Sequence, residues 1–346
     1  MARVLCVAAL LCATPLFAAG EPLPVVLFHG MGDSADSEGM TAIRQRIEAD
    51  TGAYVVSLSV GKPGDDVRSG FFGRVTEQLA SVCSEQLESD PRLAARGFNA
   101  VGFSQGGLFM RALVQTCDVR VHTLVTLGSP HGGVAQVPAC SAGEGSVFCN
   151  QMAKLVRAGA YSALVQGSVV QAQYFRAAND EPGFLQHSVF LAPANNLVPD
   201  ARNVTYAKRL AALDRLVLFR FADDATVVPR DSAWFAVQSG ADVVPLEQQE
   251  LYSADWLGLR ALDASGRLTL AECPGPHMRF TLDWFAENVV QPYFLGSTER
   301  AGAGSMLGAG PWARVVRAAA VCQAWAASWR QFGEASAATS RRLLRK

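Results

Sequence analysis

The stretch that decides the fold is AVGFSQGG, residues 100–107. An apolar run over Asn99–Phe103 predicts a buried β-strand, and the spacing of apolar residues over Leu108–Cys117 predicts an α-helix after it. Ser104 stands between two of the glycines, in the pattern Gly-x-Ser-x-Gly. In a strand–turn–helix segment of this kind, the serine has strained backbone angles and an exposed hydroxyl at the carboxyl edge of the sheet. The segment therefore predicts a nucleophile elbow with Ser104 as the nucleophile.

Strands and helices alternate along the chain on both sides of this elbow. Apolar runs predict further strands at Leu23–Phe28, Tyr54–Val60, Thr123–Leu127 and Leu216–Phe221. Helical spacing predicts helices at Thr41–Ala49, Phe71–Leu87 and Phe280–Tyr293. Strands that alternate with helices form mostly parallel sheets covered on both faces, so we expect an α/β fold.

The alternation breaks at about residues 130–213. Glycine, serine and cysteine come first, and helical patterns follow at Met152–Arg157 and Ser168–Ala178. This segment predicts a helical insertion in the sheet that forms a lid or a substrate-binding subdomain.

Length, charge and the amino-terminal residues limit the class of protein. The chain has 346 residues, half of them hydrophobic, and a net charge of −1. These values favour one large α/β domain and argue against nucleic acid as the main partner. Residues 1–20 combine Arg3, a short apolar run and small residues at a cleavage site, which is the pattern of a signal peptide. We expect a domain over residues 21–296 in the secretory pathway.

Residues 297–346 form a basic extension after this domain. They hold eight basic and two acidic residues, and the alanine- and glycine-rich residues 301–310 predict a linker. Apolar side chains from Trp312 to Phe332 recur every three or four residues with arginines beside them, which predicts an amphipathic helix. Such a helix docks on the domain, remains partly disordered, or lies on a membrane surface.

The elbow serine needs a base and an acid. A serine hydroxyl is a weak nucleophile until a base takes its proton, and in folds with this elbow the acid and then the histidine follow the serine along the chain. His277 lies in a loop before the final helix, where the base belongs. Asp223 and Asp224 both follow a predicted strand, so either can orient the imidazole. His131 follows a strand too, but it precedes any suitable acid.

An oxyanion hole needs two backbone amides. One comes from Gln105, the residue after the nucleophile, and the other from the loop after the first strand, which begins at His29. Glycines on both sides of Met31 let its amide turn inward, so Met31 is the first choice and Gly30 the alternative. We expect His29 to hold this loop by hydrogen bonds. This chemistry requires neither a metal nor a cofactor, and no Cys-x-x-Cys points to a zinc site.

Six cysteines remain once residues 1–20 are removed. An even number in a secretory chain predicts disulfides. Cys140 and Cys149 bracket a short glycine- and serine-rich loop and are a natural pair. Asn203 begins an N-glycosylation sequon, Asn-Val-Thr, which is used if the host glycosylates.

The chain resembles the palmitoyl-protein thioesterases of the lysosomal type 1 kind. The stretches that carry the resemblance are FHGMGDS at 28–34, FSQGG at 103–107, AGAY at 158–161, DSAWF at 231–235, LEQQELY at 246–252 and LGL at 257–259. The similarity runs from about Pro22 to Gly296, nearly the whole chain between the signal peptide and the basic extension.

This resemblance implies an α/β-hydrolase fold whose helical insertion forms a groove for the acyl chain. Carried over residue by residue, it implies the nucleophile Ser104, the acid Asp224 rather than Asp223, the base His277, and the oxyanion amides of Met31 and Gln105. It also implies two disulfides, Cys83–Cys117 and Cys140–Cys149, and leaves Cys273, for which Cys322 is a candidate partner.

The resulting hypothesis is a serine thioesterase that removes long-chain fatty acyl groups from protein cysteines through an acyl-serine intermediate. Its partners are S-acylated proteins or peptides and long-chain acyl thioesters, and its location is the lysosome or the cell exterior. Two alternatives stay open. A lipase or carboxylesterase uses the same triad on oxyesters, which LGSPHGG at 127–133 favours, and a lipid-binding protein keeps the groove without turnover.

Overall fold

The computed structural model describes residues 21–61, 64–137 and 146–295. The predicted signal peptide, the basic extension, Cys140 and Cys322 lie outside these residues. In the part of the chain that is described, no helix combines the length and the apolar composition needed to cross a membrane.

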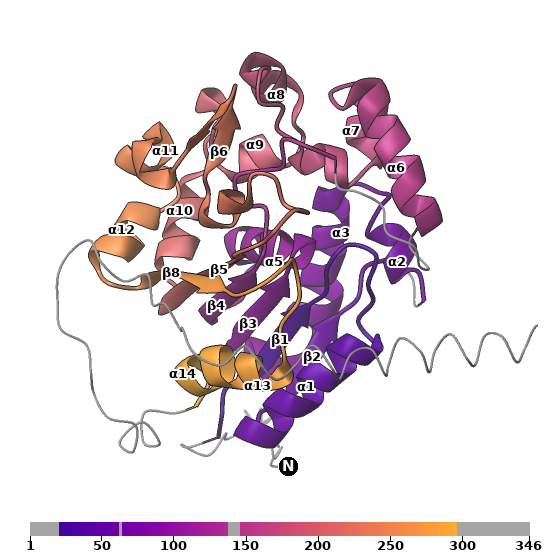
Figure 1. Ribbon diagram of the computed structural model, residues 1–346. Helices are drawn as coiled ribbons and strands as arrows, with labels where there is room; N and C mark the ends of the chain where they lie inside the picture. Colours follow the sequence, from indigo (N-terminus) through magenta and orange to yellow (C-terminus); the bar gives the residue numbers. More distant parts are fainter. Residues whose placement is uncertain (1–20, 62–63, 138–145, 296–346) are drawn as a thin grey trace, which may run out of the picture. The chain divides into compact units, whose positions relative to one another are not determined.

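Six parallel strands form the central sheet of the described chain (Figure 1). They are β1 (Val25–Phe28), β2 (Val55–Leu58), β3 (Phe98–Phe103), β4 (Val121–Leu127), β5 (Arg215–Phe221) and β8 (Leu268–Cys273). Their order across the sheet is β2-β1-β3-β4-β5-β8, and every neighbouring pair is parallel. The five strands predicted from the sequence are all present, and the α/β class is confirmed.

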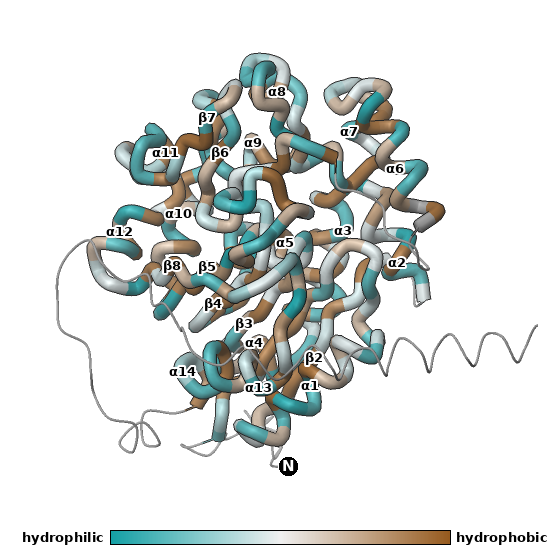
Figure 2. Tube along the Cα trace, in the orientation of Figure 1, coloured by the Kyte–Doolittle hydropathy of each residue, from teal (hydrophilic) through white to brown (hydrophobic). Residues whose placement is uncertain are grey.

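Helices cover both faces of this sheet. One face carries α1 (Glu38–Thr51), α13 (Leu282–Phe285) and a π-helical segment (Ala286–Val290), and the other carries α3 (Val75–Val82), α5 (Gln105–Thr116) and α10 (Val204–Ala211). Val25 and Leu27 of β1 pack on the first group, whereas Val26 and Phe28 pack on the second. Because both faces are covered, the strands are apolar at most positions rather than at alternate ones, and Figure 2 shows largely hydrophobic strands among helices rich in hydrophilic residues.

The chain between β4 and β5 is helical where it is described. It contains α6 (Ser146–Gly159), α7 (Ala163–Ser168), the 3-10 turn η2 (Gln171–Tyr174), α8 (Glu181–His187), α9 (Leu191–Ala194), η3 (Pro199–Ala201) and α10. Elsewhere the chain forms α2 (Asp66–Ser69), the π-helical segment η1 (Cys83–Leu87), α4 (Pro91–Ala94), η4 (Arg230–Trp234), the antiparallel strands β6 (Val237–Ser239) and β7 (Asp242–Val244), η5 (Leu246–Gln248), α11 (Glu250–Ser253), α12 (Leu259–Ala264) and α14 (Gln291–Tyr293).

Two predicted helices differ from the structure for one shared reason. The helix predicted from Phe71 begins only at Val75, and the segment predicted as helical over Ser168–Ala178 contains the end of α7 and the turn η2. Backbone hydrogen bonds join these two segments, from Gly73 to the Ser168 carbonyl (2.9 Å) and from Val170 to the Phe71 carbonyl (3.0 Å). Long-range backbone pairing therefore overrides the local helical spacing.

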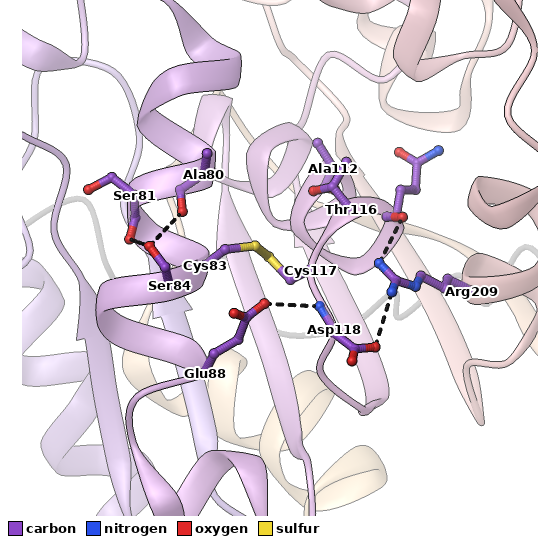
Figure 3. The surroundings of a disulfide bond; sticks show 11 residues. Ala80, Ser81, Cys83, Ser84, Glu88, Ala112, Thr116, Cys117, Asp118 and Arg209 are labelled. Carbon is purple, nitrogen blue, oxygen red and sulfur yellow. Dashed lines mark hydrogen bonds and ion pairs between the residues drawn. A yellow bond between two sulfur atoms is a disulfide. The ribbon is translucent and has the colours of Figure 1, made fainter.

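A disulfide joins Cys83, the first residue of η1, to Cys117 at the end of α5, as the resemblance implied (Figure 3). Next to it the Glu88 carboxylate accepts a hydrogen bond from the Asp118 amide (3.2 Å). Arg209 of α10 donates to the Asp118 carboxylate (3.1 Å). Covalent and polar contacts thus connect the ends of α3, α5 and α10.

The other cysteines have different outcomes. Cys149 is disulfide-bonded, and its pairing with Cys140 stays a prediction because Cys140 is not among the described residues. Cys273 carries a free thiol, so the suggested bond to Cys322 is wrong. The Cys273 side chain is buried in the apolar cluster on the face of the sheet that carries α1 and α13.

Candidate active site

Ser104 occupies a sharp turn between β3 and α5. Its φ of 51° and ψ of −123° lie where residues other than glycine are uncommon. The Ser104 amide donates to the Leu127 carbonyl in β4 (2.7 Å), and the Ser104 carbonyl accepts from the Gly107 amide (3.0 Å). A strained residue of this kind costs about 1–3 kcal/mol and persists only where its surroundings determine its conformation.

Glycines allow three segments to meet at this turn. A Cβ atom on Gly102 would lie 2.3 Å from the Gly107 Cα, and one on Gly106 would lie 2.2 Å from the His29 carbonyl oxygen. Real Cβ atoms do not approach so closely, so only glycine permits this packing of β3, α5 and the loop after β1. As a result Gly30 lies against Ser104, with 3.3 Å between an ideal Gly30 Cβ and the Ser104 Cβ.

Two hydrogen bonds connect Ser104, His277 and Asp224. The Ser104 Oγ is 2.9 Å from the His277 Nε2, and the His277 Nδ1 is 2.6 Å from the Asp224 Oδ2. The second carboxylate oxygen of Asp224 accepts from the amides of Thr226 (2.8 Å) and Val227 (2.9 Å). The three side chains follow β3, β5 and β8, so the carboxyl ends of parallel strands bring together residues far apart in the chain.

The carboxylate determines which imidazole nitrogen carries the proton. An ionised carboxylate only accepts hydrogen bonds, so the Nδ1–H of His277 donates to Asp224. A neutral imidazole carries one ring proton, and Nε2 is therefore left with the lone pair that faces the Ser104 hydroxyl. This arrangement can activate a serine and stabilise the imidazolium that forms.

The alternative acid and base lie in other surroundings. Asp223 is exposed, and its backbone amide donates to the Gly275 carbonyl. His131 is fully buried, accepts a hydrogen bond at Nδ1 from Arg111 (3.2 Å), and has its Nε2 3.0 Å from the Thr126 Oγ1. Burial and the adjacent Arg111 charge hold the pKa of His131 well below its usual range. His131 is therefore a neutral imidazole within the core.

The two amides expected in an oxyanion hole belong to the residue after Ser104 and to the loop after β1. Gln105 is the first residue of α5, so its N–H has no intrahelical acceptor and the helix N-terminus favours negative charge there. Among the described residues, no hydrogen bond from the Met31 amide occurs either. The choice between Met31 and Gly30 stays a prediction. The His29 Nδ1 donates to the Gly30 carbonyl (2.9 Å), so His29 does contact this loop as expected.

A buried carboxylate, that of Asp66, stabilises the loop after β1 by hydrogen bonds. Asp66 of α2 accepts hydrogen bonds from the Ala35 amide (3.0 Å), the Ser59 hydroxyl (2.7 Å) and the Val60 amide (2.6 Å), and its Oδ2 lies 3.9 Å from the His29 Nε2. Burial alone raises the pKa of Asp66, but His29 and these donors outweigh it and lower the pKa to about 2. The charged carboxylate thus ties the loop after β1 to the chain after β2.

Sequence reasoning missed the polar side chains beneath the elbow. Gln105, Gln171 and Tyr174 are buried and hydrogen-bonded to one another. A glutamine is usually exposed, so its place in the chain gives no signal that its amide group is buried. No cluster of three or more potential metal-binding side chains occurs within the described ranges.

The parallel sheet and the strand–turn–helix segment around Ser104 define the chain as an α/β-hydrolase. The family model for palmitoyl protein thioesterase matches residues 24–277, and the chain belongs to this family. The resemblance seen in the sequence motifs is therefore confirmed.

Curated relatives agree with this assignment. The chain is similar to palmitoyl-protein thioesterase 1 of Caenorhabditis elegans, with 35% identity over 284 residues that cover 80% of this chain and 93% of that protein. It is also similar to palmitoyl-protein thioesterase 3 of Dictyostelium discoideum, with 33% identity over 303 residues that cover 86% and 98%. The lysosomal thioesterase PPT2 homolog of Drosophila melanogaster is 25% identical over 258 residues, which cover 73% and 85%.

Proposed function

We propose that this chain is a serine thioesterase that hydrolyses long-chain fatty acyl thioesters on protein cysteines. Membership of the palmitoyl protein thioesterase family supports the thioester bond and the long acyl chain. The observation that carries the proposed reaction is the line of hydrogen bonds from the Ser104 hydroxyl through His277 to the Asp224 carboxylate.

In the first half of the proposed reaction, His277 Nε2 takes the Ser104 proton as the hydroxyl oxygen attacks the thioester carbonyl carbon. The carbonyl oxygen becomes an oxyanion, which the amides of Gln105 and Met31 stabilise by hydrogen bonds. Asp224 stabilises the imidazolium at Nδ1. The C–S bond then breaks, His277 protonates the leaving sulfur, and an acyl-serine remains.

Water completes the cycle with the same groups. His277 takes a proton from a water molecule, and the resulting hydroxide attacks the acyl-serine carbonyl. The oxyanion forms again at the two amides. The bond to the Ser104 oxygen breaks, His277 returns the proton to that oxygen, and the fatty acid leaves.

The proposed acyl site lies on α6 and α7, in the helical segment between β4 and β5. One apolar cluster contains Phe71 together with Met152 of α6 and Val165 of α7, and Met31 packs against it. Apolar side chains of the segment thus reach the loop that is proposed to bind the oxyanion. This contact supports a long acyl chain whose carboxyl end lies at Ser104.

The proposed partners are S-acylated proteins or peptides, and the proposed location is the secretory pathway, including the lysosome. The Cys83–Cys117 disulfide supports an oxidising compartment. The Drosophila relative is named a lysosomal thioesterase. Asn203 is exposed and its Oδ1 accepts from the Thr205 amide (2.9 Å), which keeps it a candidate for glycosylation.

A comparison of two substrates tests the proposal. An S-palmitoyl-cysteine peptide and the matched O-palmitoyl-serine peptide differ in one atom, and we expect the thioester to have the higher kcat/KM. A large preference for the oxyester contradicts the proposal and favours a lipase or carboxylesterase. Ser104→Ala should lose about 10⁶-fold in kcat, the effect of removing the nucleophile of such a triad. If this variant retains most of its turnover, Ser104 is not the nucleophile.

A further inference from the structure

A buried group of polar side chains lies directly beneath the nucleophile elbow. It consists of Gln105 of α5, Gln171 and Tyr174 of η2, and the backbone carbonyl of Gly70, and we call it the amide clamp. The Gln105 Nε2 donates to the Gly70 carbonyl (3.0 Å). The Gln105 Oε1 accepts from the Gln171 Nε2 (2.8 Å) and from the Tyr174 hydroxyl (2.9 Å), and the Gln171 Nε2 also donates to the Gly70 carbonyl (2.7 Å).

The clamp permits one orientation of the Gln105 side chain. Gly70 offers a carbonyl, which only accepts, so the NH2 group of Gln105 faces Gly70 and its oxygen faces Gln171 and Tyr174. All three side chains are at most 4% exposed, so water does not compete for these bonds. Burial also raises the pKa of Tyr174, which keeps its hydroxyl a donor.

One member of the clamp contains an atom that lowers the stability of the folded protein. The Gln171 Oε1 is buried and has no hydrogen-bond partner among the described residues. An unpaired buried acceptor destabilises the folded protein, and such groups in native proteins call for an explanation beyond stability. The two hydrogen bonds that Gln171 donates, to Gln105 and to Gly70, offset part of this cost.

The clamp contacts both sources of the proposed oxyanion amides. Gln105 supplies one N–H itself, and its side chain fixes where the residue lies at the start of α5. Gly70 lies against the loop that supplies the other N–H, because a Cβ on Gly70 would be 3.5 Å from the Gly32 nitrogen. The phenyl ring of Phe71 lies equally close to that loop, 3.4 Å from an ideal Gly32 Cβ.

We propose that Gln105, Gln171 and Tyr174 are positioning residues that hold the two amides of the oxyanion hole in register. Gln171 and Tyr174 belong to η2, so their bonds to Gln105 and Gly70 connect η2 directly to the residues that position the hole. The segment proposed to bind the acyl chain thereby controls the stabilisation of the transition state. This inference takes its substrate, a long-chain acyl thioester, from the proposed function. Its chemistry requires only that Ser104 is the nucleophile.

Three single variants test the proposal. Tyr174→Phe removes one donor to Gln105 and keeps the aromatic ring. Gln171→Met removes the Nε2 group, and with it the bonds to Gln105 and to Gly70, and has a side chain of similar length. The matched control is Gln173→Met. Gln173 is also a fully buried glutamine of η2, but it bonds to the Gly73 carbonyl (2.7 Å) and the Val75 amide (3.0 Å), not to the clamp.

Each variant is measured with the S-palmitoyl peptide and with a long-chain alkyl fluorophosphonate, whose attachment to Ser104 is followed by intact mass. Loss of a whole oxyanion donor lowers kcat about 10²–10³-fold, so a displaced donor should lower it about 10-fold in Tyr174→Phe and about 30-fold in Gln171→Met. KM should stay within about twofold, and the fluorophosphonate rate should fall by the same factor as kcat. Gln173→Met should lower the melting temperature as Gln171→Met does and leave kcat near the wild-type value.

The proposal is overturned if Tyr174→Phe and Gln171→Met both retain kcat within about twofold of wild type. It is equally overturned if Gln173→Met loses as much kcat as Gln171→Met, because the effect then belongs to packing of η2. If Gln171→Met does not fold, the comparison of kcat between Tyr174→Phe and Gln173→Met decides whether the proposal holds. A wild-type protein that reacts with the fluorophosphonate but not with the thioester contradicts the proposed function alone, and the fluorophosphonate rates still test the clamp.

Discussion

Replacing Asp224 by asparagine tests the proposed triad with almost no change of shape. The Asp224 Oδ1 accepts two backbone N–H groups, from Thr226 and Val227, and only an oxygen can do so. The asparagine oxygen will therefore occupy this position, and its NH2 group will face the His277 Nδ1. A donor at Nδ1 moves the ring proton to Nε2. His277 then has no lone pair for the Ser104 proton.

The expected loss in kcat is about 10⁴-fold, the effect of the same tautomer change in serine proteases, and it corresponds to about 5 kcal/mol in the activation free energy. The Asp224 side chain is 1% exposed, so water cannot replace the lost acceptor. The assay is steady-state hydrolysis of the S-palmitoyl peptide, with thermal unfolding to show that the variant is folded.

Asp223→Asn is the matched control, because it makes the same change of charge one residue away on an exposed side chain. It should retain kcat within about twofold of wild type. The reasoning is refuted if a folded Asp224→Asn variant keeps more than about a tenth of the wild-type kcat. It is also refuted if Asp223→Asn loses as much.

Three further predictions concern stability. The pKa of the Asp66 carboxyl is about 2 in the folded protein and 3.8 when unperturbed. The ionised group therefore contributes about 2 kcal/mol to the free energy of unfolding, a contribution that is complete above about pH 4 and is lost as the pH falls to about 2. Urea unfolding of wild type and of Asp66→Asn across this pH range measures it. Gly106→Ala places a Cβ 2.2 Å from the His29 carbonyl oxygen and should abolish the folded elbow, which circular dichroism and activity detect. The double variant Cys83→Ser/Cys117→Ser opens a loop of sequence separation 34 and should lower the free energy of unfolding by about 3–4 kcal/mol in urea titrations.

Specific results contradict each of these expectations. An Asp66→Asn variant whose stability falls with acid as steeply as that of wild type shows that another group titrates. An active, fully stable Gly106→Ala variant shows that the start of α5 and the backbone at His29 can move apart to admit a Cβ atom. Equal unfolding midpoints for the double cysteine variant and the oxidised wild type show that the disulfide does not restrain the unfolded chain.

The sequence was sufficient to find the sheet, the elbow and the histidine candidate. Parallel strands covered on both faces are apolar at most positions, and the order of residues along the chain limits where a base can stand. The local sequence pattern could not decide between Asp223 and Asp224, because two adjacent carboxylates in a loop are equivalent until the backbone conformation is known. In the structure the amides of Thr226 and Val227 hold Asp224 inward and Asp223 faces solvent.

The parts that could not be predicted depend on contacts between distant segments. The start of α3 at Val75 follows from backbone pairing with the chain near Ser168, nearly a hundred residues away. The amide clamp joins Gln105 to Gln171 across 66 positions. Neither residue type nor spacing carries information about such partners, since glutamine has the same appearance in a sequence whether it is exposed or paired.

The position of β8 has a consequence for how the protein fails on heating. β8 is one of the two edge strands of the sheet, it is hydrogen-bonded only to β5 within this sheet, and most of its residues are only half-buried. The terminal strand of a sheet opens at a lower free-energy cost than its centre. Since His277 follows this strand, opening of β8 moves the imidazole away from Ser104 while the central strands are still folded. Loss of turnover on heating therefore measures the detachment of β8 from β5, and it precedes the global unfolding of the domain.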